Sequence, residues 1–326
     1  MSTGTGPFTY YHSLNGARRA RPSRPFAVGA SAREIARLEK AEQAKSLYES
    51  LQAIGRLHMQ DFPPARRLAA EMAGLPDFST VLADAEREAL RGISLLKPGL
   101  RREARTRARG LAEERARALL TDAQSAQREQ QAELDSLWDR LVANDHEVVL
   151  SALAAAFEDN EAPAAAVGVE NSEVLIVVLA PGVGAVPERL PTTTDAGNLS
   201  IRKMTKSTRH EYHRQVVAGY AVVSAKETFA VAPGVERVSV VVLQSNPDRA
   251  NDSSTAVPVL VTRLHREALV EVPPAPMGAW DLVERCGSDN LVHLKGVAQE
   301  LRPLDLAAYP ELADIAGRVE FGRRAY

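Results

Sequence analysis

The sequence predicts an α+β or α/β fold in which a long-helix, coiled-coil-like region precedes a C-terminal domain built around a mixed sheet. Strand-like aliphatic runs first appear after Asp145. Residues 100–142 are rich in Ala, Arg, Glu and Gln, which are good helix formers. The later segments follow the order helix–strand–strand–helix–strand–strand, which is typical of a compact domain with a mixed sheet. These observations divide the chain into residues 1–30, 31–144 and 145–326.

Residues 1–30 are expected to form a basic, flexible arm. Glycines and prolines recur through this segment and interrupt regular structure. Its charged side chains are all basic, namely Arg18, Arg19, Arg21 and Arg24. The arm is interpreted either as a solvated tail or as a segment that contacts an anion.

Residues 31–144 are expected to form a helical hairpin or coiled-coil region. The spacing of Ser31 and Glu34 is that of a capping box, which begins a helix by satisfying two free backbone N–H groups. Pro63 and Pro64 end this helix because proline cannot donate to the helical hydrogen-bond ladder. Further helices are predicted at residues 64–73, 79–92 and 100–142, with a break at 96–99.

The helix predicted at residues 100–142 is a rod about 60 Å long at ~1.5 Å per residue. Several of its apolar side chains recur at three- and four-residue steps and form a thin stripe, which suits pairing with another long helix. The rod is too polar to be buried on all sides, so self-association into a homo-oligomer is expected. The stripe contains Leu111, Leu119, Ala123, Ala126, Leu134, Leu137 and Leu141.

Residues 145–326 are expected to fold without the helical region, because they contain every strand signal and their own aliphatic runs. A short helix precedes two strands around a turn at Asn171–Ser172. The unbroken aliphatic run from Val174 to Leu179 indicates a strand that is covered on both faces. A helix at 205–231 and strands at 236–244 and 256–266 follow. Short helices are expected around Trp280, Leu294 and Leu312.

Composition excludes several classes of protein. With a single cysteine, Cys286, the chain has neither a disulfide framework nor a Cys-rich zinc module. Lys and Arg number 40 against 42 acids, so the overall charge indicates no partner. The sequence has neither an apolar stretch long enough to span a membrane nor the pattern of a secretory signal. A cytoplasmic protein with no cofactor and no membrane partner is expected.

The one unusual charge cluster lies between Leu190 and Gln215. Cations crowd the expected start of the 205–231 helix, where the helix dipole opposes them at a cost of roughly 0.3–1 kcal/mol each when exposed. An anionic partner would remove this cost, and free backbone N–H groups and threonine hydroxyls would add donors. The predicted anion-binding residues are Thr192, Thr194, Arg202, Lys203, Lys206, Arg209 and His213.

Within this cluster, Arg202, Lys206 and Arg209 are expected to share one helix face, with Asn198 or Ser200 as the helix cap. A nucleic acid or another anionic ligand is the expected partner. Two simpler interpretations also fit the same cations. They can form a solvated helix face, or they can pair with acids elsewhere in the fold, such as Glu236 or Asp248.

Two short motifs suggest chemistry but lack required parts. Ser200 and Lys203 have the Ser-x-x-Lys spacing of penicillin-binding enzymes, but the other motifs of that family do not occur in its layout. His210 and His213 have a spacing that places both on one helix face, yet a metal site would need a distant third ligand such as His265. Structural or solvated histidines are the simpler interpretation.

The order of elements also describes the core of restriction endonucleases. Their metal site needs carboxylates and an Asp/Glu-x-Lys sequence on a strand, which together hold Mg²⁺ beside an activated water. Glu170 and Glu173 are the available carboxylates, but Val174 and Leu175 follow Glu173 and the lysine is missing. A degenerate nuclease or another hydrolase therefore stays as an alternative.

Two regions resemble known bacterial sequences. The segment GTGPFTYYHSL, residues 4–14, resembles the closing segment of a small, uncharacterised β-rich domain common at the N-termini of bacterial proteins. The block from Arg189 to Leu243 resembles the C-terminal part of uncharacterised proteins of high-GC Gram-positive bacteria, which pair such features with a coiled coil. The resemblance implies one bacterial lineage, and that group has no established activity to carry over.

Together these patterns predict a non-enzymatic interaction or scaffold protein. Its long helices would mediate self-association, and its C-terminal domain would bind an anionic partner. The alternative is a hydrolase or degenerate nuclease-like enzyme in the C-terminal domain. Three carboxylates or histidines within reach of one point would favour the enzyme.

Overall fold

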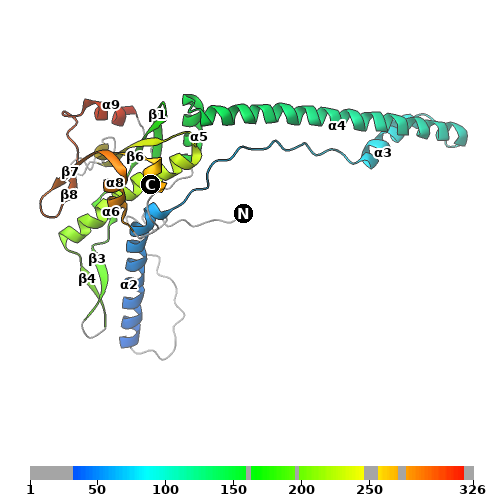
Figure 1. The fold of residues 1–326 in the computed structure, drawn as a ribbon. Helices are drawn as coiled ribbons and strands as arrows, with labels where there is room; N and C mark the ends of the chain where they lie inside the picture. The colour runs from blue at the N-terminus through cyan, green and yellow to red at the C-terminus, as the bar shows by residue number, and fades with distance from the viewer. Residues whose placement is uncertain (1–31, 159–162, 195–197, 246–255, 271–276, 319–326) are drawn as a thin grey trace. The chain divides into compact units, whose positions relative to one another are not determined.

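The computed structural model describes residues 32–158, 163–194, 198–245, 256–270 and 277–318 (Figure 1). Contacts divide the chain into unit 1, residues 1–65 with 141–326, and unit 2, residues 66–140. The predicted basic arm, the Ser31 cap and the segment GTGPFTYYHSL lie outside the described residues. In the part of the chain that the structure describes, no helix is both long enough and apolar enough to cross a membrane.

Unit 1 is built around a mixed six-stranded sheet. Strands β2 and β5 are parallel, whereas the other neighbouring strands are antiparallel. This sheet, with the helices that cover it, confirms the predicted α+β class. In spatial order the strands are β1 (Ala164–Glu170), β2 (Glu173–Leu179), β5 (Arg237–Ser245), β6 (Ala256–His265), β7 (Gly287–Lys295) and β8 (Glu300–Arg302).

Both faces of strand β2 are covered, as its aliphatic run predicts. Successive side chains of a strand point to opposite faces of the sheet. Ile176 and Val178 therefore belong to the core cluster that contains helices α5 (His146–Glu158) and α6 (Lys206–Val231). Val177 belongs instead to a second cluster, which includes Leu312 of helix α9 (Pro310–Arg318).

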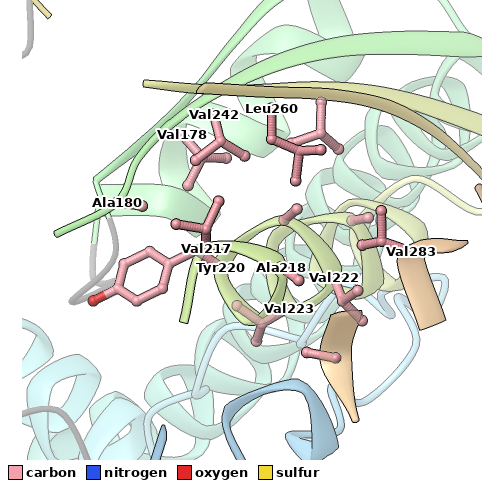
Figure 2. Close-up of a cluster of buried hydrophobic side chains, with 14 of the residues drawn as sticks. Val178, Ala180, Val217, Ala218, Tyr220, Val222, Val223, Val242, Leu260 and Val283 are labelled. Carbon is pink, nitrogen blue, oxygen red and sulfur yellow. The ribbon is translucent and has the colours of Figure 1, made fainter. Parts of the chain in front are cut away.

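Helix α6 is the central helix of unit 1. Every residue from Val216 to Ala225 is buried, so the helix is surrounded by protein and has no solvent face over this length. Figure 2 shows Val178, Val242 and Leu260 of the sheet on one side of the helix, and Val283 of helix α8 (Ala279–Cys286) on another. The predicted helix at 205–231 is confirmed to within one residue.

Helix α2 (Ala32–Arg56) and the 3-10 helix η1 (Leu57–Met59) complete the core of unit 1. Leu51, Ile54 and Leu57 are buried in the same cluster as α6. Gly219 permits this close approach, because a Cβ atom there would lie 3.2 Å from the side chain of Leu57. The sequence had placed these residues in the helical region 31–144, whereas their contacts place them with the sheet.

Unit 2 contains helix α3 (Phe78–Ala89) and most of helix α4 (Pro98–Val142). The rod begins two residues earlier than predicted. Pro98 suits this position, because the first N–H groups of a helix have no partner within it. Val81 and Ala85 of α3 pack with Ala108 and Ala112 of α4, whose small side chains let the two helices approach closely.

The helix predicted at residues 64–73 is wrong, since residues 60–77 have no regular secondary structure. Within unit 2, side chains of α4 bind the backbone of this segment. Gln131 Oε1 accepts a hydrogen bond from Ala70 N at 2.8 Å, and Gln127 Nε2 donates to Ala70 O at 3.0 Å. These amides satisfy both backbone groups of Ala70, so this residue needs no helical hydrogen bonds.

The C-terminal half contains two further differences from the sequence-based expectation. Leu294 lies in strand β7 rather than in a short helix, whereas the helices around Trp280 and Leu312 are confirmed. A separate two-stranded hairpin, which contacts α2, was not predicted. The remaining elements are its strands β3 (Arg189–Thr193) and β4 (Leu199–Lys203), with η2 (Val183–Ala185) and α7 (Arg266–Val270).

Candidate anion-binding surface

The predicted anion-binding stretch folds as the β3–β4 hairpin followed directly by α6. Thr205 caps the helix, and its Oγ1 accepts a hydrogen bond from the backbone N–H of Thr208 at 3.1 Å. The predicted caps, Asn198 and Ser200, are wrong. They lie at the turn end of the hairpin, because strand pairing continues to Lys203 before the helix begins.

Arg202 and Lys203 lie on strand β4, so the prediction that Arg202, Lys206 and Arg209 share one helix face is wrong. Four exposed cations nonetheless lie near the junction of the hairpin and α6, although Arg202 and Lys203, as neighbours on a strand, point to opposite faces of the hairpin. Strand pairing adds Arg189, which lies directly opposite Lys203. We call the following four residues the basic cluster: Arg189, Arg202, Lys203 and Lys206.

The positive charges of the basic cluster repel one another. Like charges directly opposite in an antiparallel pair are destabilising, and Arg189 and Lys203 occupy such a pair. The nearest acid, Glu188, pairs instead with Arg209 at 3.4 Å. Within the residues that the structure describes, none of the four cations has an ion pair. An external anion would therefore relieve repulsion that the described part of the fold leaves in place.

The other predicted surface residues are engaged within the fold. Arg209 pairs with Glu188, so its charge is already balanced. Thr194 Oγ1 accepts a hydrogen bond from Asn198 N at 3.1 Å, which helps to close the hairpin. The hydroxyl of Thr192 donates to the carbonyl of the next residue at 3.4 Å. An external anion would therefore pair with the cations of the basic cluster and not with these side chains, which already have partners in the fold.

His213 belongs to the core and not to the surface. Its Nε2 forms a hydrogen bond with the Nε2 amide of Gln244 at 2.8 Å, and this amide also donates to Pro181 O at 2.9 Å. Burial lowers the pKa of His213 to about 4, and the nearby charges of Arg209 and Arg214 act in the same direction. The ring is therefore uncharged at neutral pH and adds no cation to the surface.

The motifs considered for acyl transfer and metal binding do not form such sites. Ser200 and Lys203 lie on a strand, where residues three apart point to opposite faces. His210 and His213 do share helix α6, but His213 is bonded to Gln244. Among the described residues, no group of three His, Cys, Asp or Glu side chains could hold a metal ion.

Glu173, the carboxylate considered for a nuclease, is neutralised by arginines. Its Oε1 accepts hydrogen bonds from Ser239 Oγ at 2.5 Å and Arg263 Nε at 2.8 Å, and its Oε2 accepts from Arg237 Nε at 3.3 Å. Partial burial raises the pKa of Glu173, but these hydrogen bonds and the arginine charge outweigh it and hold the pKa below its ordinary value. A magnesium ion would have to displace the arginines, so this geometry does not favour nuclease chemistry.

Sequence reasoning missed Arg189 because it missed the hairpin. The signal was available, since the run from Leu190 to Lys203 has polar and apolar residues on either side of an Asp-Ala-Gly-Asn turn sequence. The pairing of the two strands, and not sequence spacing, is what brings Arg189 to Lys203.

Comparison of the chain with protein-family models, with curated proteins and with solved structures finds no match. The resemblance of the segments 4–14 and 189–243 to bacterial sequences therefore stays a hypothesis.

Proposed function

We propose that this protein is a non-enzymatic scaffold that self-associates through unit 2 and binds a phosphate-bearing polyanion through the basic cluster of unit 1. The observation that supports this proposal is that Arg189 and Lys203 lie directly opposite each other on paired strands. Two further exposed cations lie nearby in the chain, and none of the four has a described ion pair. A cytoplasmic nucleic acid is the class of ligand that this charge suits best. The alternative, a hydrolase or degenerate nuclease, has no comparable support, because arginine side chains already balance the charge of Glu173.

Self-association is supported by the distribution of exposed apolar side chains. Most of the large apolar side chains that are exposed in the described residues lie in unit 2. One of them, Leu119, lines a groove of about 370 Å³ between α3 and α4, whose wall also contains Pro76 and Ala118 and the charged side chains of Asp84, Arg115 and Asp122. Exposed apolar side chains that gather on one part of a soluble protein are typical of interaction sites. A second copy of the rod is the proposed occupant.

We expect the full chain to have a mass well above 35.3 kDa in multi-angle light scattering at micromolar concentration. The double change Leu119→Glu with Leu120→Glu should return the mass to that of a monomer, because both side chains are 40% exposed and would place charge in the interface. The matched control is Val270→Glu with Val297→Glu, on exposed positions of unit 1. A monomeric wild type over a concentration series would refute self-association.

Anion binding is tested by titrating DNA, RNA and inorganic phosphate at two salt concentrations. With three or four of these cations contacting phosphates, the slope of log affinity against log salt should be about −2 to −4 for polyanions. The triple change Arg202→Ala, Lys203→Ala and Lys206→Ala should remove most of the binding and flatten the slope. Tyr212 is the one aromatic side chain near the cluster in the sequence, so no preference among base sequences is expected.

The control for this titration removes the same charge elsewhere. Arg56, Arg285 and Lys295 are exposed in unit 1, and their change to Ala should leave binding intact. Equal loss in both triple variants would assign binding to net charge rather than to the basic cluster. No binding by the wild type would leave the cluster as a solvated surface.

A further inference from the structure

The turn between α3 and α4 presents large apolar side chains to solvent. Leu95 is 81% exposed and Leu96 is 90% exposed, and Leu100 in the first turn of α4 is 48% exposed. We call residues 90–102, which include this turn, the tip of unit 2. Burial of leucine side chains is favourable, so a partner that covers the tip would gain stability from this contact.

Hydrogen bonds within the tip hold it in this shape. Ile93 N donates to Leu90 O at 3.1 Å, and Lys97 N donates to Ser94 O at 3.1 Å. Arg101 Nη1 donates to Ile93 O at 3.0 Å and so ties the turn to the start of α4. The exposure of the leucines is therefore a property of an ordered turn.

Cations flank the exposed leucines. The nearest acids are engaged, since Glu88 pairs with Arg115 at 2.7 Å and Glu103 with Arg107 at 4.0 Å. The first turn of α4 contains no acid, so the positive end of its dipole has the same sign as the side chains around it. The tip itself contains no acid, and its cations are Arg91, Lys97, Arg101 and Arg102.

We propose that the tip binds the surface of an anionic lipid bilayer. Leu95 and Leu96 insert among the headgroups, and the flanking cations pair with phosphate and carboxylate groups. Apolar insertion and a polybasic segment are two membrane signals, and surface binding generally needs more than one. The expectation of no membrane partner rested on the lack of a spanning segment, and contact with the surface needs none.

A lipid surface fits the tip better than a folded partner does. A stable protein interface buries about 800 Å² on each side with complementary shape, whereas the tip is a short turn whose two most exposed leucines are adjacent. The surface of a bilayer can adapt its shape to such a turn. Binding then requires only apolar side chains that insert among the lipids and cations that attract the anionic headgroups. This inference concerns unit 2 and does not depend on the basic cluster of unit 1.

Vesicle sedimentation with the full chain tests the proposal. We expect binding to vesicles of phosphatidylcholine with phosphatidylserine, weaker binding when salt is raised, and little binding to phosphatidylcholine alone. Leu95→Ser with Leu96→Ser should lower the partition coefficient at least tenfold. These side chains are almost fully exposed, so an unchanged thermal melt should accompany the loss.

Two controls separate the tip from other surfaces. Val270→Ser with Val297→Ser removes two exposed aliphatic side chains from unit 1 and should bind vesicles as the wild type does. The triple alanine variant of Arg56, Arg285 and Lys295, which are exposed cations of unit 1 outside the basic cluster, should also retain binding. The proposal is overturned if the wild type does not sediment, if the leucine variant binds normally, or if only the triple variant loses binding. It is equally overturned if the leucine variant loses oligomer mass in light scattering, which would assign Leu95 and Leu96 to a contact with a second copy.

Discussion

Lowering the pH from about 6.5 to about 4 is expected to destabilise unit 1 by about 3 kcal/mol through His213 alone. The unfolded state binds a proton near the ordinary histidine pKa of 6.5, whereas burial holds the pKa of folded His213 at about 4. Between these values the unfolded state binds more protons, so stability falls as the pH falls. Burial also lowers the pKa of His58, whose contribution has the same sign.

Urea unfolding at several pH values, followed by tryptophan fluorescence, measures this effect. A Trp138→Phe background leaves Trp280, which is largely buried in unit 1, as the reporter. His213→Gln should flatten the pH dependence, because the glutamine amide can still meet Gln244 but does not titrate. The exposed His293 on β7 provides the control His293→Gln, which should keep the wild-type slope. If wild type and His213→Gln lose stability in parallel as the pH falls, His213 is not the group responsible.

The elements that could be predicted are those whose sequence pattern is compatible with only one secondary structure. The helix at 206–231 ends at the turn sequence Ala-Pro-Gly-Val, and both of its bounds were predicted closely, although its cap, Thr205, was not. The aliphatic run of β2 fits only a strand that is covered on both faces, and that too is confirmed. In these segments local signals and burial agree, so the sequence alone defines the structure.

The elements that could not be predicted depend on distant partners. Residues 64–73 have helix-forming composition, yet Gln127 and Gln131 of α4 bind the backbone there and hold it out of a helix. Sequence spacing found three of the four basic-cluster residues and added Arg209 and His213, which an ion pair and burial respectively remove from it. The composition of the sequence showed which segment contains the cations, but strand pairing determines which cations lie opposite each other.

A fragment of residues 145–326 is expected to lack a cooperative unfolding transition, although the sequence alone predicted that it would fold by itself. Its core would lose Leu51, Ile54 and Leu57, which are buried against α6 in unit 1. Truncating a single buried leucine or isoleucine costs about 2–5 kcal/mol. Losing three such side chains approaches or exceeds the roughly 5–15 kcal/mol of total stability that is typical of a domain.

The matched variant joins residues 1–65 to residues 141–326 through a short Gly/Ser linker and omits unit 2. This connection is geometrically reasonable, since Ala65 N donates to Ala230 O at 2.7 Å and the carbonyl of Val142 lies 2.1 Å from where a Cβ atom on Gly234 would be. Both ends of the deletion therefore meet near the C-terminal end of α6. Thermal denaturation followed by circular dichroism should give one sharp transition for the joined variant and a broad one for residues 145–326. A sharp transition in the shorter fragment would mean that α2 and η1 cover a core that the sheet and α6 already stabilise on their own.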